Sequence, residues 1–240
     1  RREEAKEDPV RNGTRWLIPL AMAGGLLAGC TPATPVSVPP EVPLQQAQID
    51  ARTTLLQAAE APEAVVRARA IEALSRTLGD EAGPTYVEAL SDPAPGVQFA
   101  AALAVGRVRY APALVRLQEM AAAQGPDKRV YSGVIYALYR VGNTEHMKDM
   151  IRLLLHRQEE VRGNAVMVMG MLGLPSGVRP LEQGLLPDET DKTVMLQVVE
   201  ALAMLGEEQY ARKLEGYARE PFLDDRLMAV RAMGRLALPS

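Results

Sequence analysis

Hydrophobic positions along most of the chain recur with the spacing of short amphipathic helices. From about Ile49 onward, one frame appears six times: an opening residue, then small or apolar residues four, seven, eight and eleven positions later. These offsets share one side of a helix with about 3.6 residues per turn, so they predict a face that packs into a core. The frames open at Val66, Val97, Val130, Val161, Val194 and Asp225, at intervals of 31 or 33 residues.

A second short helix is expected before each frame. Residues 51–61, 111–123, 145–156 and 210–220 have the required spacing of apolar positions. Prolines fall between the paired helices, where a helix loses least by a missing N–H; they are Pro62, Pro93, Pro95, Pro126, Pro187 and Pro221. Because one such pair cannot bury its apolar face alone, about six pairs over residues 49–240 predict an all-α fold, an α-solenoid.

The frames resemble the HEAT repeat, in the short bacterial form called the PBS-lyase HEAT-like repeat. The purest copies are VRARAIEALS at 66–75 and VRGNAVMVMG at 161–170. Arginine follows the opening residue in three copies, as Arg67, Arg162 and Arg226. In the other three copies the residue is Gln98, Tyr131 or Met195. The resemblance implies a right-handed superhelix with an extended concave face, but it says little about function because such repeats serve unrelated roles.

Composition agrees with a helical fold and narrows the function. Hydrophobic residues make up 48% of the 240 residues and aromatic residues only 4%, a balance that favours close-packed helices over β-sandwiches. The net charge of -3, with acids and bases interspersed, lacks the basic footprint of a nucleic-acid binder. A single cysteine excludes a disulfide framework within the chain and a cysteine-rich metal site.

Residues 1–29 are expected to be a bacterial lipoprotein signal peptide. The apolar run 16–29 is shorter than the ~20 residues of a membrane-spanning helix and follows two arginines. It ends in Leu27-Ala28-Gly29-Cys30, which resembles the lipobox. The resemblance implies that Cys30 becomes the mature amino terminus and carries acyl chains such as palmitate. The acids in RREEAKEDPV are unusual for such a signal, and a translation start at Val10 would leave the basic segment RNGTR.

Residues 30–48 are expected to be the lipidated cysteine and a tether. Five prolines between Thr31 and Pro43 favour polyproline II, so the segment would reach on the order of 50 Å. A peptide ligand for a proline-recognising module is the alternative. Thr31 stands where an aspartate would signal inner-membrane retention in enteric bacteria, which favours the periplasmic side of the outer membrane.

The residues that carry chemistry do not form a recognisable catalytic constellation. His146 and His156 would lie about 15 Å apart on one helix, too far to share a metal ion, and we interpret them as solvated helix-end residues. The acidic loop 187–191 is interpreted as a helix cap, because it lacks the glycine and distal glutamate of a calcium loop. No phosphate-binding glycine loop or nucleophile elbow is present, and the chain lacks the His-Glu pairs of HEAT-type hydroxylases.

A partner-binding ridge is expected on the second helix of the middle repeats. The frame offsets two, six and nine point away from the core stripe, and several of them carry large apolar side chains: Phe99, Leu103, Tyr136, Tyr139, Met167 and Leu196. An exposed apolar ridge on a concave face would suit a peptide or a helix of a partner. The alternative is lateral packing between adjacent repeats.

The sequence therefore predicts a non-catalytic scaffold or adaptor, held by a lipid in the bacterial cell envelope. It would bind a protein or peptide through the concave face, with no nucleic acid, small-molecule substrate or cofactor other than the lipid on Cys30. The alternatives are an enzyme of unrecognised type, a regulatory subunit, or a chaperone-like carrier of exported peptides.

Overall fold

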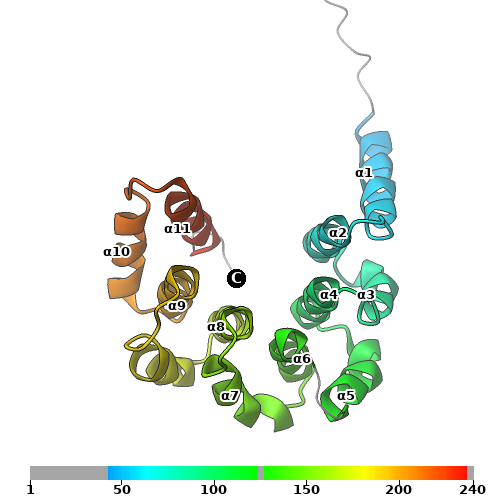
Figure 1. Ribbon diagram of the computed structural model, residues 1–240. Helices are drawn as coiled ribbons and strands as arrows, with labels where there is room; N and C mark the ends of the chain where they lie inside the picture. Colours follow the sequence, from blue (N-terminus) through cyan, green and yellow to red (C-terminus); the bar gives the residue numbers. More distant parts are fainter. Residues whose placement is uncertain (1–42, 124–126, 237–240) are drawn as a thin grey trace, which may run out of the picture. The chain divides into compact units, whose positions relative to one another are not determined.

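The computed structural model describes residues 43–123 and 127–236. The chain divides into two units, Arg1–Glu41 and Val42–Ser240, and every described residue belongs to the second. Within this second unit, helices stack side by side along an arc, with one row on the inner side and another on the outer side (Figure 1). The described residues contain no β-strand.

Six helices form the inner row, and each contains one of the predicted frames. They are α2 (Ala64–Thr77), α4 (Pro95–Val108), α6 (Lys128–Arg140), α8 (Glu159–Leu172), α9 (Lys192–Met204) and α11 (Leu223–Leu236). Each packs against the next along the arc. The predicted core stripe is confirmed at offsets four, seven and eight, where all residues are buried except the partly buried Ala73 and Met233. In α2, Val66 at the opening and Thr77 at offset eleven are exposed.

The outer row is shorter and less regular. Its helices are α1 (Leu44–Ala58), α3 (Gly83–Ala89), α5 (Leu114–Ala122), α7 (Met150–Leu154) and α10 (Glu208–Tyr217), and a π-helical segment, Pro180–Leu185, takes this place before α9. Short 3-10 helices lead into several of them: Gly79–Ala82, Ala111–Ala113, Glu145–Asp149 and Pro175–Gly177. Outer and inner helices pack in pairs, so this part of the chain is an all-α solenoid, as predicted.

Two predicted boundaries are corrected. Helix α1 begins at Leu44, so the last five residues of the predicted tether, 44–48, are helical. The last proline of the tether, Pro43, occupies the N-cap position of α1. The residues after it have backbone N–H groups, which proline lacks, so they can form helical hydrogen bonds. Residues 145–156 do not form one helix, because a 3-10 helix gives way to α7 and the chain leaves the helix before His156.

Glycines let neighbouring inner helices approach closely. A Cβ on Gly133 of α6 would stand 2.7 Å from the ring of Phe99 on α4, and a Cβ on Gly106 of α4 would stand 2.5 Å from the ring of Tyr136 on α6. Between α8 and α9, a Cβ on Gly170 would meet the Cα of Ala201 at 2.9 Å. Adjacent inner helices are therefore closely packed, because aromatic rings or backbone atoms of one helix fill the space that a side chain would occupy at the glycine of the other.

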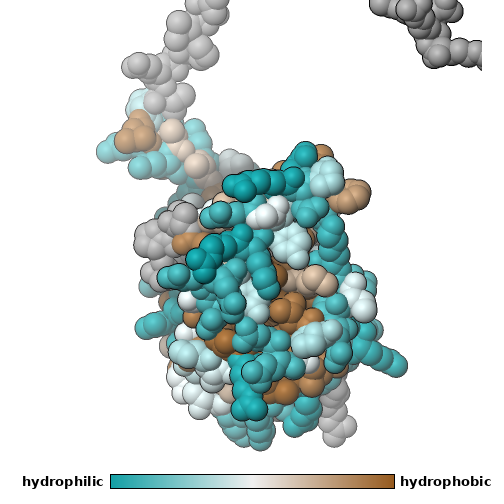
Figure 2. Space-filling model, turned by 90° about the vertical axis from the view of Figure 1, so that its left-hand side faces the viewer, coloured by the Kyte–Doolittle hydropathy of each residue, from teal (hydrophilic) through white to brown (hydrophobic). Residues whose placement is uncertain are grey.

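Most of the surface on the α10 side of the stack is polar. Figure 2 shows that side, and hydrophilic side chains cover most of it, with hydrophobic ones in separate patches. In the part of the chain that the structure describes, none of the helices has both the length and the apolar character to span a bilayer.

Candidate partner-binding face

The predicted ridge is corrected by the structure. Phe99, Tyr136 and Leu196 are buried, so they cannot form an exposed apolar surface. Leu103, Tyr139 and Met167 are partly buried. The contacts across Gly133 and Gly106 show that Phe99 and Tyr136 pack between adjacent repeats, which is the alternative interpretation of these positions.

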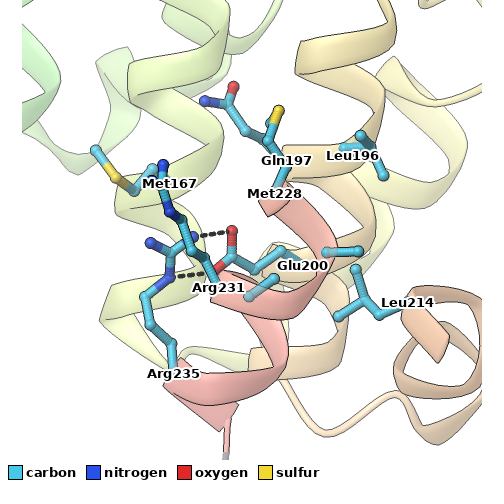
Figure 3. Close-up of a pocket in the computed structure, with 10 residues that line it drawn as sticks. Met167, Leu196, Gln197, Glu200, Leu214, Met228, Arg231 and Arg235 are labelled. Atoms are coloured by element: carbon cyan, nitrogen blue, oxygen red, sulfur yellow. Dashed lines mark hydrogen bonds and ion pairs between the residues drawn. The ribbon is translucent and has the colours of Figure 1, made fainter. Parts of the chain in front are cut away.

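A shallow pocket on the inner side of the stack does contain two of the ridge residues. Met167 on α8 and Leu196 on α9 line it, together with Met228 and Arg231 on α11 (Figure 3). Its volume is ≈ 80 Å³, well below the roughly 300–1,000 Å³ of a typical small-molecule site. A pocket of this size suits one apolar side chain of a partner, and unbranched methionines adapt to such an insertion.

An ion pair borders the pocket. The guanidinium of Arg235 on α11 donates from Nε and Nη2 to the two carboxylate oxygens of Glu200 on α9, with Nη2 at 2.7 Å (Figure 3). This hydrogen bonding raises the pKa of Arg235, against a smaller opposing effect of burial, and the carboxylate of Glu72 on α2 raises it further. Arg231 beside them is exposed and makes no ion pair within the described ranges 43–123 and 127–236. The pocket therefore combines an apolar floor with a cationic rim.

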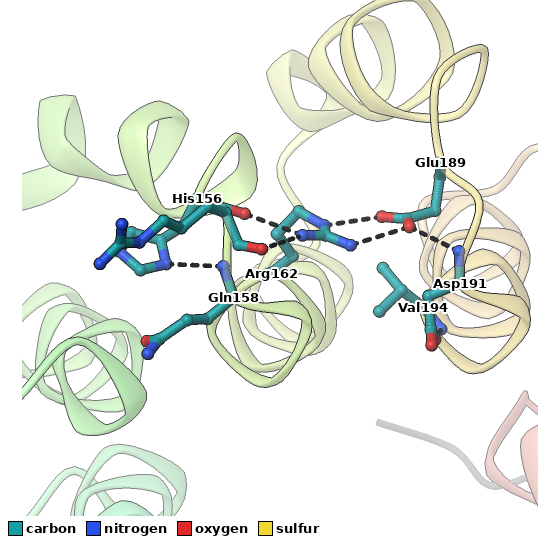
Figure 4. Close-up of polar contacts among 7 residues, drawn as sticks. His156, Gln158, Arg162, Glu189, Asp191 and Val194 are labelled. Atoms are coloured by element: carbon teal, nitrogen blue, oxygen red, sulfur yellow. Dashed lines mark hydrogen bonds and ion pairs between the residues drawn. The ribbon is translucent and has the colours of Figure 1, made fainter.

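The arginine after the frame opening ties one repeat to the next at two places, Arg67 and Arg162. The guanidinium of Arg162 donates to both carboxylate oxygens of Glu189, at 2.7 and 2.9 Å, and to the carbonyls of His156 and Arg157, at 2.9 and 3.1 Å (Figure 4). Glu189 also accepts a hydrogen bond from the N–H of Asp191. One side chain thus donates to two backbone carbonyls in the loop before its own helix, and its ion pair with Glu189 holds the loop that leads into α9.

The same geometry recurs at Arg67, and part of it at Gln98. Arg67 donates to both oxygens of Asp92, at 2.7 and 2.9 Å, and to the carbonyl six residues before it, that of Ala61. Gln98 reaches the equivalent carbonyl, that of Asp92, at 2.6 Å. The hydrogen bond from Arg67 lowers the pKa of Asp92. These bonds are structural, and they keep the inner helices in register along the stack.

Sequence reasoning noted the arginines but missed this role. The sequence does contain a pattern that indicates these ion pairs. An arginine stands one residue after a frame opening, and an acid stands five residues before the next opening, as in Arg67 with Asp92 and Arg162 with Glu189. Neither position stands out alone, because the two lie 25 to 27 residues apart.

The two histidines occupy different settings. His146 is half-buried, and its Nδ1 lies 3.0 Å from the hydroxyl of Tyr131, which donates to Asp149 at 2.9 Å. Burial, and then the hydrogen bond to Asp149, raise the pKa of Tyr131 far above its ordinary value. The interpretation of His146 as a solvated helix end is therefore wrong. His156 follows α7, and its Nδ1 accepts a hydrogen bond from the N–H of Gln158.

The interpretation of the acidic loop 187–191 as a cap is confirmed. Asp191 is the N-cap of α9 and accepts a hydrogen bond from the N–H of Val194 at 2.8 Å. Glu189 is committed to Arg162. In the described ranges, His, Cys, Asp and Glu side chains do not gather in groups of three or more that would suit a metal ion.

The predicted lipidation site and lipobox, Cys30 with Leu27, Ala28 and Gly29, lie outside the described residues. The fold that is described defines an α-solenoid of paired helices. Compared with models of known families, residues 52–125 match HEAT repeats, and this match supports a HEAT-repeat protein. No curated protein matches the chain.

Proposed function

We propose that this protein is a lipid-anchored adaptor of the bacterial envelope that binds a protein partner through the inner face of its solenoid. The observation that carries the proposal is the pocket between α8, α9 and α11, which has an apolar floor and a cationic rim on the inner side of the stack. HEAT repeats commonly mediate protein–protein interactions, and the match at residues 52–125 supports this part of the proposal.

The chemistry of the pocket indicates the partner segment. Met167 and Met228 offer a flexible apolar surface, and Arg231 offers an exposed guanidinium beside it. A peptide or helix with one apolar anchor would bury it on the methionines, and a partner carboxylate beside the anchor would be attracted to the cationic rim. Partner binding of this kind needs no turnover, and the proposed adaptor is non-catalytic.

Anchoring rests on the lipobox at residues 27–30 and on the apolar run before it. The acyl chains would retain the solenoid at the membrane, because two or more chains bind stably where one binds marginally. The proline-rich segment after Cys30 would hold the solenoid away from the bilayer, on the periplasmic side of the outer membrane.

Replacing Cys30 by alanine is expected to abolish acylation and processing together. In a host with lipoprotein-processing enzymes, the unaltered chain should incorporate labelled palmitate and lose residues 1–29, because the thiol receives the lipid before cleavage. The Cys30→Ala variant should keep residues 1–29 and remain unlabelled, whereas Thr31→Ser should behave as the unaltered chain. Label on Cys30→Ala, or none on the unaltered chain, would exclude the anchor. Label incorporation and intact mass provide the two readouts.

A further inference from the structure

Helix α11 exposes side chains at two positions that the internal helices α4, α6, α8 and α9 bury. Five residues after the frame opening stand Ile71, Ala102, Ile135, Val166 and Val199, which are 0 to 2% exposed, whereas the equivalent Val230 is 56% exposed. Two residues after the opening, Phe99, Ser132 and Leu196 are buried, whereas Leu227 is 43% exposed. Phe99 shows what this position contacts, because its ring packs on Gly133 of the next inner helix.

Arg226 on α11 has the position of Arg67 and Arg162 but lacks their carboxylate partner. Its guanidinium lies 3.4 and 3.5 Å from the carbonyls of Glu220 and Pro221, and no carboxylate of the described residues binds it. The outward side of α11 therefore has the features of an internal repeat interface, with apolar side chains and an arginine, and not those of a polar capping repeat.

The opposite end of the stack carries a charged cluster on α2, beside the exposed valines Val65 and Val66. Arg69 and Arg76 on α2 bind the carboxylate of Glu72 at 2.9 and 2.7 Å, on the positions where α6 carries buried residues such as Tyr136. Burying this charged cluster against the apolar side of α11 would remove its groups from water without new partners. A head-to-tail association of two copies is therefore disfavoured.

The charges on α11 are arranged to match a second α11. Asp224 near its beginning and Arg231 near its end are seven residues apart, so they lie on the same flank of the apolar stripe formed by Leu223, Leu227 and Val230. Both side chains are exposed, and neither makes an ion pair among the residues placed by the structure. When two helices pair antiparallel, equal flanks face each other, so each Asp224 would meet the Arg231 of the other copy.

We propose that the occupant of this surface is a second copy of the chain, packed α11 against α11 in antiparallel orientation about a two-fold axis. Leu227 and Val230 form the centre of the contact, and two Asp224–Arg231 pairs flank it. A two-fold contact uses the same patch on both copies and closes at the dimer.

Sedimentation velocity of the full chain in a mild detergent, at micromolar concentrations, tests the proposal. The unaltered chain should sediment as a dimer. Val230→Asp should sediment as a monomer because it buries a carboxylate in the contact, whereas Val115→Asp, at an exposed valine of α5, should remain dimeric. Circular dichroism checks that each variant keeps its helices.

Charge reversal separates this arrangement from others. Asp224→Arg alone and Arg231→Asp alone should each weaken the dimer by about tenfold, because both flanking pairs become repulsive. An equal mixture of the two variants should restore the dimer, because each copy then meets its opposite charge at both pairs. A monomeric unaltered chain, open-ended polymers, insensitivity to Val230→Asp, or a mixture no tighter than either variant alone would overturn the proposal.

Discussion

Replacing Arg162 by methionine is expected to lower the free energy of unfolding by about 3–5 kcal/mol. The carboxylate of Glu189 is 1% exposed and receives both of its side-chain hydrogen bonds from Arg162. Methionine fills a similar space but leaves this buried charge without a cation, and it also releases the carbonyls of His156 and Arg157. Chemical denaturation followed by circular dichroism at neutral pH measures the loss.

Two comparisons identify the cause of that loss. Arg69→Met is the matched control, because the exposed pair of Arg69 with Glu72 contributes little to stability.

The pH dependence of the free energy of unfolding is the second comparison. Burial raises the pKa of Glu189, but the hydrogen bonds from Arg162 and from the N–H of Asp191 outweigh it and hold the pKa below its ordinary value of 4.5. The stabilisation is therefore complete above pH 4.5 and is lost as the pH falls through the lower pKa of the folded state. A gap between the unaltered chain and Arg162→Met that stays constant into acid would contradict the assignment.

Replacing Gly170 by valine is expected to cost about 3 kcal/mol or to prevent folding. A Cβ at this position would stand 2.9 Å from the Cα of Ala201 and 3.1 Å from its Cβ, so the obstacle is the backbone of α9 and cannot rotate away. The helices α8 and α9 would have to separate, and the pocket that both of them line would change with them. Thermal unfolding followed by circular dichroism measures the effect.

Gly216 provides the matched control for this substitution. It lies in α10, is exposed, and a Cβ there would meet no atom within 4 Å. Gly216→Val should leave stability unchanged or raise it by roughly a few tenths of a kcal/mol, because valine is a better helix former than glycine. Equal losses at Gly170 and Gly216 would mean that close helix contact is not the reason for glycine at 170.

The sequence was sufficient for the fold because one spacing dominates it. Offsets four, seven and eight place small or apolar residues on one side of each inner helix, and these side chains are buried in the stack, apart from the partly buried Ala73 and Met233. The outer helices were harder to predict. The i, i+3 spacing of residues 145–156 fits a 3-10 helix as well as an α-helix, and the structure has both there.

The binding face could not be predicted from one helix at a time. The spacing separates the core side of a helix from its other sides, but it does not tell a side that faces the next repeat from one that faces solvent. For this reason the spacing predicts Phe99 and Tyr136 as part of a ridge, although each fills the space over a glycine of the neighbouring helix. The pocket joins Met167 with residues of α11 some 60 positions later, so only the folded stack brings them together.

Contact between the inner face and a partner is the claim on which the proposed function depends most. A photo-crosslinking residue at position 167, in the pocket, and separately at position 115, on the exposed side of α5, would report contact directly when the full chain is expressed in a bacterial envelope. We expect a discrete adduct with another protein from position 167 and none from position 115. The same adducts from both positions, or an adduct from position 115 alone, would contradict binding through the inner face.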